Sequence, residues 1–268
     1  MDGACPVAVY LDAQNSDEGR RTQRKACAVV AELLGWERAE CLPWPGLGAH
    51  HAAALKRALA DRYAPNTVNR HLCAWRGMAM AAWRLGFIDT EKRERLTDIK
   101  ALRIRQPPSG RCLEREELTL LRSAAGARDL AILALLYGGG LRRAEAASLH
   151  ALPALESGSV RVRGKGDVVR VVPLPPWAQR DFSAGAPTGV TTARGIGRVV
   201  ERLVERAALE AVSPHDLRRS YCTHMLEAGA DVATVARLMG HASPQVTMRY
   251  DRRGERAKEQ AAERLPEP

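Results

Sequence analysis

Apolar residues in the first hundred positions recur at the spacing of an α-helix. Two stretches each place them on one side of a helix, at Val29, Val30, Leu33 and Leu34 and then at Val68, Leu72, Trp75, Ala79 and Ala82. Pro65, Asn66 and Thr67 are suited to begin the second helix, and Gly86 is suited to end it. This spacing predicts a helical bundle over residues 1–105.

The helical spacing is interrupted between residues 103 and 111. Pro107 and Pro108 are followed by Ser109 and Gly110, and consecutive prolines do not fit inside a helix or a central strand. We therefore expect a linker at residues 106–112, preceded by a helical domain at 1–105 and followed by a second domain at 113–268.

The second half combines helical spacing with one region of alternation. Residues 159–174 alternate apolar and polar positions around a Gly-Lys-Gly-Asp turn, which predicts a β-hairpin with Lys165 at its tip. Residues 175–190 are rich in proline, glycine and alanine without a clear period, and we expect a loop. The predicted fold class is mainly α with a small β-hairpin, an α+β domain joined to the helical bundle. Helices are expected at 113–123, 128–137, 142–149, 196–208, 216–228, 231–239 and 255–265.

The composition favours nucleic acid as a partner. Lys and Arg number 41 against 31 Asp and Glu, a net charge of +10, and arginine, which outnumbers lysine, suits bidentate contacts to phosphate. An arginine-rich but ordinary surface explains the charge equally well. The longest apolar run, Leu130–Tyr137, is far shorter than a membrane span, and the N-terminus has no secretion signal. We expect a cytoplasmic protein without a membrane partner, whose six scattered cysteines are reduced thiols.

Several residues of the second half have the properties that phosphodiester chemistry requires. Two guanidinium groups, those of Arg142 and Arg218, could hold the non-bridging oxygens of a phosphate whose charge grows in the transition state. Tyr250 is the candidate nucleophile, and a tyrosine needs nearby cations or a base to attack as phenolate.

Proton transfer would fall to three further residues. His215 could manage the proton of the nucleophile, and His241 could hydrogen-bond to the phosphate or the phenol. Lys165 could protonate the departing sugar alkoxide. Each motif alone also has an ordinary structural explanation, as a helix C-cap, a hairpin turn or a residue at a helix N-terminus.

The order and spacing of these motifs are more specific than any one of them. The chain contains Gly-Gly-Leu-Arg142 with Glu145 three positions later, the Gly-Lys165-Gly turn, His215-Asp-Leu-Arg218, and Gly-His241 followed nine positions later by Tyr250. This series closely resembles the tyrosine site-specific recombinase (phage integrase) family. The resemblance implies that Glu145 supports the first arginine. It implies an active site made of Arg142, Lys165, His215, Arg218, His241 and Tyr250.

The N-terminal half resembles, less specifically, the helical core-binding domain of the same family. Residues 63–76 are similar to its DNA-facing helix, so the resemblance implies that the two domains close around double-stranded DNA. A short set of polar residues is implied to contact that DNA: Thr67, Asn69, Arg70, Arg76 and, in the second half, Arg219.

The resemblance also implies a mechanism. Tyr250 would attack a DNA phosphate to give a 3′-phosphotyrosyl bond and a free 5′-hydroxyl, without metal, ATP or another cofactor. Four protomers would assemble on two recombination sites. The segment 255–265 would pack on a neighbouring protomer or fold back on its own, and the sequence favours neither.

Two other functions remain open, and a third is disfavoured. A catalytically silent DNA-binding relative would be expected to have lost some of the six residues, and all are present. A topoisomerase of type IB would use similar chemistry but act as a monomer to relax supercoils. A metal nuclease using His215, Asp216 and His241 would need further ligands, which the sequence does not offer.

Overall fold

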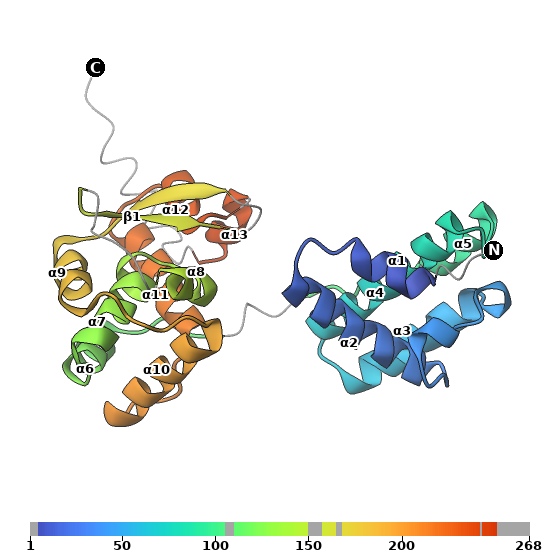
Figure 1. The fold of residues 1–268 in the computed structure, drawn as a ribbon, viewed down its shortest axis with the longest axis horizontal. Helices are drawn as coiled ribbons and strands as arrows, with labels where there is room; N and C mark the ends of the chain where they lie inside the picture. The colour runs from blue at the N-terminus through green and yellow to red at the C-terminus, as the bar shows by residue number, and fades with distance from the viewer. Residues whose placement is uncertain (1–4, 105–109, 150–156, 165–167, 242, 251–268) are drawn as a thin grey trace, which may run out of the picture. The chain divides into compact units, whose positions relative to one another are not determined.

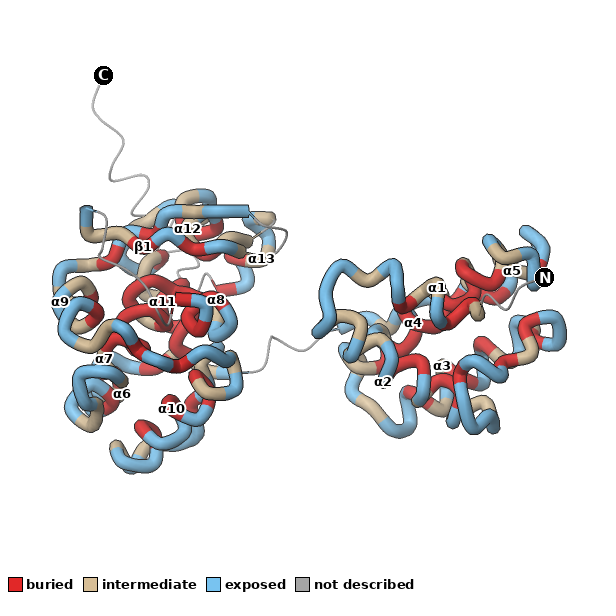
Figure 2. Tube along the Cα trace, viewed as in Figure 1, coloured by how far each residue is buried: buried red, intermediate tan, exposed pale blue. Residues whose placement is uncertain are grey.

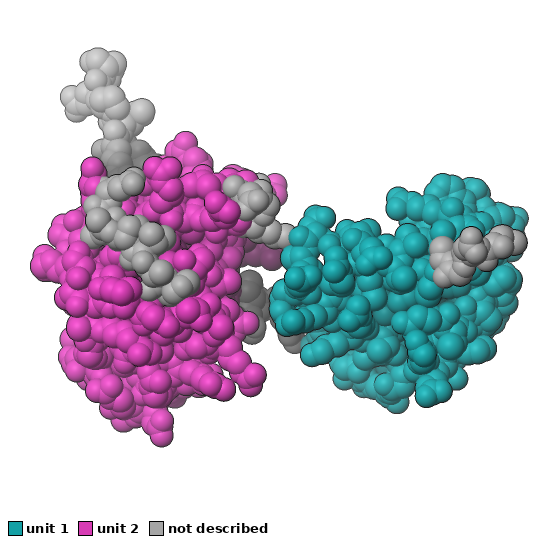
Figure 3. All heavy atoms as spheres, viewed as in Figure 1, with its two compact units in different colours: residues 1–106 teal, residues 107–268 magenta. Residues whose placement is uncertain are grey.

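The chain divides into two compact units, residues 1–106 and 107–268 (Figure 1; Figure 3). The computed structural model describes residues 5–104, 110–149, 157–164, 168–241 and 243–250.

The first unit is built from α-helices joined by short turns. Helix α4 is its centre and packs against α1, α2, α3 and α5. Two short 3₁₀ turns, Ala39–Cys41 and Trp44–Gly46, connect α2 to α3. The helices are α1 (Pro6–Asp12), α2 (Asp17–Leu33), α3 (Ala49–Arg62), α4 (Pro65–Arg84) and α5 (Thr90–Thr97).

The apolar face of α4 forms the core of this unit, as its spacing predicts. Trp75 lies at the centre of that face, with its ring 5.7 Å from that of Trp44. Its indole N–H donates to the carbonyl of Leu96 at 2.8 Å, so the buried polar atom is satisfied. The helical prediction for this half is therefore confirmed (Figure 2). The residues of the predicted stripe on α4 are all fully buried: Val68, Leu72, Trp75, Ala79 and Ala82.

The second unit is mainly helical with a small sheet, which confirms the predicted fold class. Its described residues contain one two-stranded antiparallel sheet, β1 (Ser159–Arg163) and β2 (Val169–Pro173), in which Val162 pairs with Arg170. The hairpin prediction is confirmed for these strands, but its tip, with Lys165, lies outside the described residues. The helices are α6 (Arg115–Ser123), α7 (Ala127–Leu133), α8 (Arg143–Ser148), α9 (Pro176–Gly185), α10 (Ala193–Arg206), α11 (Pro214–Glu227), α12 (Val232–Met239) and α13 (Pro244–Met248).

Residues 175–190 correct one expectation, because the predicted loop contains helix α9. Pro176 occupies the first turn, where a proline's missing N–H costs nothing. Ala178 and Phe182, four positions apart, are buried in the core of this unit. Because α9 has only ten residues and is bounded by Pro175 and Gly185, its helical spacing is too weak to recognise in the sequence.

Two other boundaries differ from the predictions in informative ways. The helix expected at 128–137 ends as α7 at Leu133 and continues as a π-helical turn, Ala134–Gly138. The short helix α13 was not predicted; its N-cap, Ser243, accepts a hydrogen bond from the amide of Gln245. The helix expected at 255–265 lies outside the described residues.

Among the helices that the structure describes, not one combines the length and the apolar character that crossing a bilayer would require.

The close packing of α9 on α7 yields a stability prediction. A Cβ atom at Gly185 would lie 1.9 Å from the carbonyl oxygen of Ala127, whereas a Cβ at Gly197 in α10 would meet nothing within 4 Å. Gly185→Ala should therefore lower the free energy of unfolding by roughly 1–3 kcal/mol, because α9 must move away from α7. The matched control, Gly197→Ala, should raise it by about 0.5–1 kcal/mol through helix propensity. Urea unfolding followed by circular dichroism measures both, and equal effects would contradict this packing.

Candidate active site

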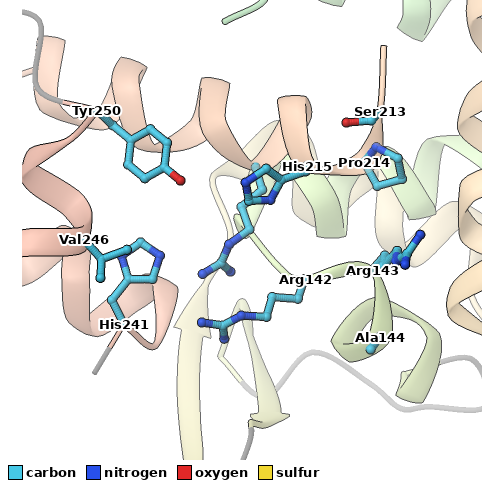
Figure 4. A pocket seen from close by; sticks show the side chains of 10 residues that line it. Arg142, Arg143, Ala144, Ser213, Pro214, His215, His241, Val246 and Tyr250 are labelled. Carbon is cyan, nitrogen blue, oxygen red and sulfur yellow. The ribbon is translucent and has the colours of Figure 1, made fainter. Parts of the chain in front are cut away.

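One pocket of about 630 Å³ in the second unit brings the predicted residues together. Five of the six catalytic candidates line it, although they are spread over residues 142–250 of the sequence. The sixth, Lys165, lies outside the described residues. In Figure 4 the hydroxyl of Tyr250 faces the space that the other labelled polar side chains surround. The residues lining the pocket are Arg142, Arg143, Ala144, Ser213, Pro214, His215, Arg218, His241, Val246 and Tyr250.

A tight turn after the π-helical segment places Arg142. Gly140 has a φ of +60°, which favours glycine, and a Cβ there would lie 2.3 Å from a ring carbon of Tyr221. Arg142 is the N-cap residue of α8, and its backbone amide donates to Oε2 of Glu145 at 2.8 Å. This turn therefore fixes the backbone from which the Arg142 side chain extends.

Glu145 is a buried carboxylate shared by several arginines. Its Oε1 accepts from Nη1 of Arg142 at 2.8 Å and from Nη1 of Arg170 at 3.0 Å, and its Oε2 accepts from Nη2 of Arg170 at 2.8 Å. Arg218 lies 3.8 Å from the same carboxylate. Burial alone would raise the pKa of Glu145, but the bonds from Arg170 and Arg142 outweigh it and lower the pKa to about 2. Glu145 therefore remains ionised.

The end of helix α12 supplies further acceptors to the same three arginines. Each of the three last carbonyl groups accepts a hydrogen bond from a different arginine. Leu238 accepts from Arg170 at 2.9 Å, Met239 from Arg218 at 2.6 Å and Gly240 from Arg142 at 2.9 Å. Carbonyl groups at a helix C-terminus lack partners within the helix and carry its negative dipole end, so they bind cations well.

Arg218 is almost completely buried in α11. Besides Met239, it donates to the carbonyl of Gly140. Burial and the neighbouring charge of Arg142 lower the pKa of Arg218 to about 10, which keeps it protonated at neutral pH. The pocket thus holds a fixed positive charge that its acceptors position.

His215 lies in the first turn of the same helix and lines the pocket. Ser213 caps α11, and its hydroxyl donates to Oδ2 of Asp216 at 2.7 Å, which stabilises this first turn. Burial and the charges of Arg219 and Arg218 lower the pKa of His215 below its ordinary value. Its imidazole is therefore neutral near pH 7 and able to accept a proton.

His241 follows the turn that ends α12. Gly240 has a φ of +61° there, and the amide of His241 donates to the carbonyl of Ala236 at 2.9 Å. Nδ1 of His241 and the buried hydroxyl of Thr247 share a hydrogen bond of 2.7 Å. Burial and the charges of Arg218 and Arg142 lower the pKa of His241 to about 4. This histidine is therefore also neutral near pH 7.

Tyr250 is held beside His241 by the short helix α13. Its amide donates to the carbonyl of Thr247 at 2.9 Å, so α13 sets the spacing between the two residues. The rings of Tyr250 and His241 are stacked, with centroids 6.4 Å apart, and the guanidinium of Arg219 lies over the Tyr250 ring at 5.2 Å. Tyr250 is 8% exposed. These contacts hold the ring, and Figure 4 shows its hydroxyl facing the pocket.

Some of the residues that were predicted to contact DNA bind other groups of this chain in the structure. The Asn69 side chain exchanges two hydrogen bonds with the backbone of Leu102, at 2.9 and 2.7 Å. Arg76 donates to the carbonyl of Ile99. Arg219 is buried against Tyr250, as described above. Arg70 is exposed and Thr67 is half-buried on α4.

Sequence reasoning did not identify Arg170 and Thr247 as members of this arrangement. Arg170 lies in a run of four valines, so its side of the strand is ambiguous in the sequence. Thr247 belongs to the motif that ends at Tyr250, but the sequence assigned it no role of its own. The signal for Arg170 was a single charged residue within an apolar strand, which requires a buried partner.

The pocket combines fixed positive charge, two neutral imidazoles and one phenol. Such a set can bind an anion, stabilise charge that develops on it and transfer protons. In the part of the chain that the structure describes, no three His, Cys, Asp or Glu residues lie together as a metal site requires.

Comparison with known proteins places this arrangement in a family. The Phage integrase family profile matches residues 182–256. Tyrosine recombinase XerC of Pelotomaculum thermopropionicum is 34% identical over 225 residues, which cover 72% of each chain. Tyrosine recombinase XerC of Myxococcus xanthus is 38% identical over 155 residues, which cover 48% of this chain and 52% of that one. The chain thus spans about half the length of the first curated relatives that it matches.

A solved structure supports the same fold. A lambda integrase dimer bound to a COC′ core site has a TM-score of 0.70 and 15% identity, with 92% of this chain and 93% of that chain covered. The 34% identical relative, of which the chain covers 72%, establishes the relationship. This chain belongs to the tyrosine site-specific recombinase (phage integrase) family.

Proposed function

We propose that this protein is a site-specific DNA recombinase or integrase that cleaves and rejoins DNA strands through a covalent 3′-phosphotyrosine, without metal or ATP. One observation carries the proposal: five residues of separate motifs line a single pocket, with the Tyr250 hydroxyl facing it. The tyrosine recombinases XerC and XerD among the relatives support the same activity.

Arg142 and Arg218 are suited to hold the scissile phosphate. Both residues line the pocket, and hydrogen bonds to backbone carbonyls fix both guanidinium groups. Their charges would stabilise the two non-bridging oxygens as negative charge grows in the transition state. Because their positions are fixed before DNA binds, little reorganisation accompanies the reaction.

His215 and Tyr250 would carry out the attack. The lowered pKa of His215 leaves it neutral, so it can accept the phenolic proton as Tyr250 attacks the phosphorus atom. The bond to the 5′-oxygen breaks, and the DNA strand becomes attached to Tyr250 through its 3′-phosphate. The energy of the broken bond is kept in the phosphotyrosine, so the reverse attack by a 5′-hydroxyl needs no ATP.

His241 would hydrogen-bond to the phosphate, and Lys165 would protonate the leaving group. Neutral His241, with Nδ1 bonded to Thr247, can use Nε2–H to hydrogen-bond to a non-bridging phosphate oxygen. Lys165 would give its proton to the departing 5′-oxygen, an expectation that rests on the sequence motif alone.

Double-stranded DNA is the proposed substrate, and a tetramer on two recombination sites is the proposed assembly. The net charge of +10 fits a polyanionic partner. Solved structures with similar folds include the Tn1549 transposon integrase in complex with transposon right end DNA and the XerH recombinase bound to its difH substrate. We propose that α4 of the first unit faces the DNA with Thr67, Arg70 and, beside them, Asn69 and Arg76. Arg219 would act close to the cleaved strand.

The nucleophile assignment predicts the outcome of an adduct assay. Wild type incubated in EDTA with suicide duplexes carrying the sequence that flanks its gene should give a covalent protein–DNA band on a denaturing gel. Tyr250→Phe should bind the same duplexes but give no adduct, because it lacks the attacking oxygen. Tyr137→Phe, which changes a tyrosine outside this pocket, is the control and should retain the adduct. An adduct in Tyr250→Phe would remove Tyr250 from this role.

The product then separates this proposal from its alternatives. Strand exchange between two sites supports a recombinase, relaxation of supercoils without exchange supports a topoisomerase, and binding without an adduct supports a silent DNA-binding protein.

The leaving-group assignment predicts a chemical rescue. Lys165→Ala should slow cleavage of a normal duplex by roughly 10²–10⁴-fold, because the 5′-oxygen then leaves as an unprotonated alkoxide. A duplex with sulfur at the 5′-bridging position should restore the rate, since a thiolate leaves without a proton. Single-turnover cleavage measures both rates. A variant that stays equally slow on both duplexes would contradict proton donation by Lys165.

The buried Glu145 predicts how stability depends on pH. Its pKa of about 2 lies below the ordinary 4.5, so its ionised form stabilises the folded state above pH 4.5, and this stabilisation is lost as the pH falls through about 2. Glu145→Gln should lower the free energy of unfolding by about 3 kcal/mol at pH 7 and by progressively less between pH 4.5 and 2.5. Urea unfolding at several pH values tests this. Glu116→Gln, an exposed glutamate of α6, is the control, and a loss independent of pH would contradict the ion pairing.

A further inference from the structure

Arg170 occupies a position where a strand normally places an apolar side chain. It faces the inner side of the hairpin with Val172, and its side chain is 12% exposed, whereas Val169 and Val171 on the outer side are 49% and 57% exposed. The strand thus buries its charged residue and exposes apolar neighbours. Because burial of an unpaired guanidinium is costly, the buried Arg170 requires hydrogen-bond and ion-pair partners.

Every nitrogen of the Arg170 guanidinium is bonded. Nη1 and Nη2 bind the two oxygens of Glu145 at 3.0 and 2.8 Å, and Nε donates to the carbonyl of Leu238 at 2.9 Å. Among the described residues, those lining the pocket do not include Arg170. Arg170 therefore does not face the phosphate, and any effect on the reaction must pass through the groups that it holds.

Those groups in turn hold the two pocket arginines. Glu145 binds Arg142, and the carbonyls that follow Leu238 bind Arg218 and Arg142. Arg170 and Arg142 each bond to both the carboxylate and the end of α12, but of the three arginines only Arg170 lies outside the pocket lining. A shift of either would displace both phosphate-binding groups.

The neighbouring glycine shows how closely this contact is fitted. A Cβ at Gly240 would lie 2.9 Å from Nη1 and 3.1 Å from Cζ of Arg170. Lysine could supply the charge of Arg170 but not three N–H groups in the directions that Glu145 and Leu238 require.

We propose that Arg170 is a positioning residue for strand cleavage, which sets Arg142 and Arg218 by clamping Glu145 and the end of helix α12. This inference rests on the proposed recombinase activity. It adds to the six expected catalytic residues a hairpin residue that acts without touching the DNA.

Single-turnover cleavage of the suicide duplex by Arg170→Lys tests the proposal. At saturating protein, the rate constant should fall roughly 100-fold, because both arginines lose their fixed positions. The dissociation constant for DNA, measured in a Tyr250→Phe background so that no strand is cut, should stay within about 2-fold. A merely structural role would instead lower the fraction of active protein and leave the rate constant of that fraction unchanged, which would overturn the proposal.

Arg122→Lys is the matched control. Arg122 also makes two bonds to one carboxylate, that of Asp181, at 3.1 and 2.7 Å, but outside the pocket. Its cleavage rate should equal that of wild type. An equal slowing in Arg122→Lys and Arg170→Lys would show a general effect of breaking an ion pair and would overturn the proposal.

A double variant tests whether Arg170 acts through Glu145. The pair Arg170→Met and Glu145→Gln removes both charges together, so neither is left buried without a partner. Its rate should be close to that of Glu145→Gln alone, because coupled residues are not additive. The single variants Arg170→Met and Glu145→Gln are measured beside it. A wild-type rate in the double variant, or a loss equal to the sum of the two single losses in activation free energy, would overturn the proposal.

These outcomes separate the two levels of inference. If wild type forms an adduct and Arg170→Lys cleaves at the same rate, the role of Arg170 is overturned and the recombinase activity is not. Wild type that forms no adduct contradicts the recombinase activity, and this inference with it.

Discussion

The second unit depends on one buried carboxylate and the arginines that surround it. Glu145 accepts hydrogen bonds from Arg142 and Arg170, and Arg218 lies 3.8 Å away. Three guanidinium groups this close would repel one another without it. The carboxylate offsets one of the three charges and leaves a positive site that an anion can occupy. The hydrogen bonds and charges of these arginines also lower the pKa of Glu145 to about 2, although its burial would raise it.

The end of helix α12 completes this arrangement with neutral groups. Three successive carbonyls, from Leu238 to Gly240, each accept from a different arginine. These hydrogen bonds orient the guanidinium groups without neutralising their charge. A second carboxylate would neutralise it. Burial and then the charges of nearby arginines lower the pKa values of His215 and His241, so both imidazoles are neutral near pH 7. The arginines suited to bind an anion thus also favour imidazoles that can accept a proton.

The sequence predicted the regular parts of this fold well and the irregular parts poorly. The stripe on α4 is long and periodic, and every one of its apolar positions is buried. Helix α9 was expected to be a loop because its contacts depend on small residues: Gly138 and Gly185 let it approach α7 and the π-helical turn closely. Small residues carry almost no periodic signal, because their contribution is the space that they leave free. The π-helical turn and α13 are likewise set by local packing, which the spacing of apolar residues does not report.

The sequence by itself determined the chemical types and the order of the candidate residues, because motifs such as Gly-Leu-Arg142 and His215-Asp-Leu-Arg218 are local. It could not determine which charged groups meet, since Arg170 and Leu238 are 68 positions apart. Nor could it show that Asn69 and Arg76 bind the backbone of residues 99–102. Only the tertiary structure decided these pairings, because hydrogen bonds and ion pairs act over a few ångströms in space and are independent of distance along the chain.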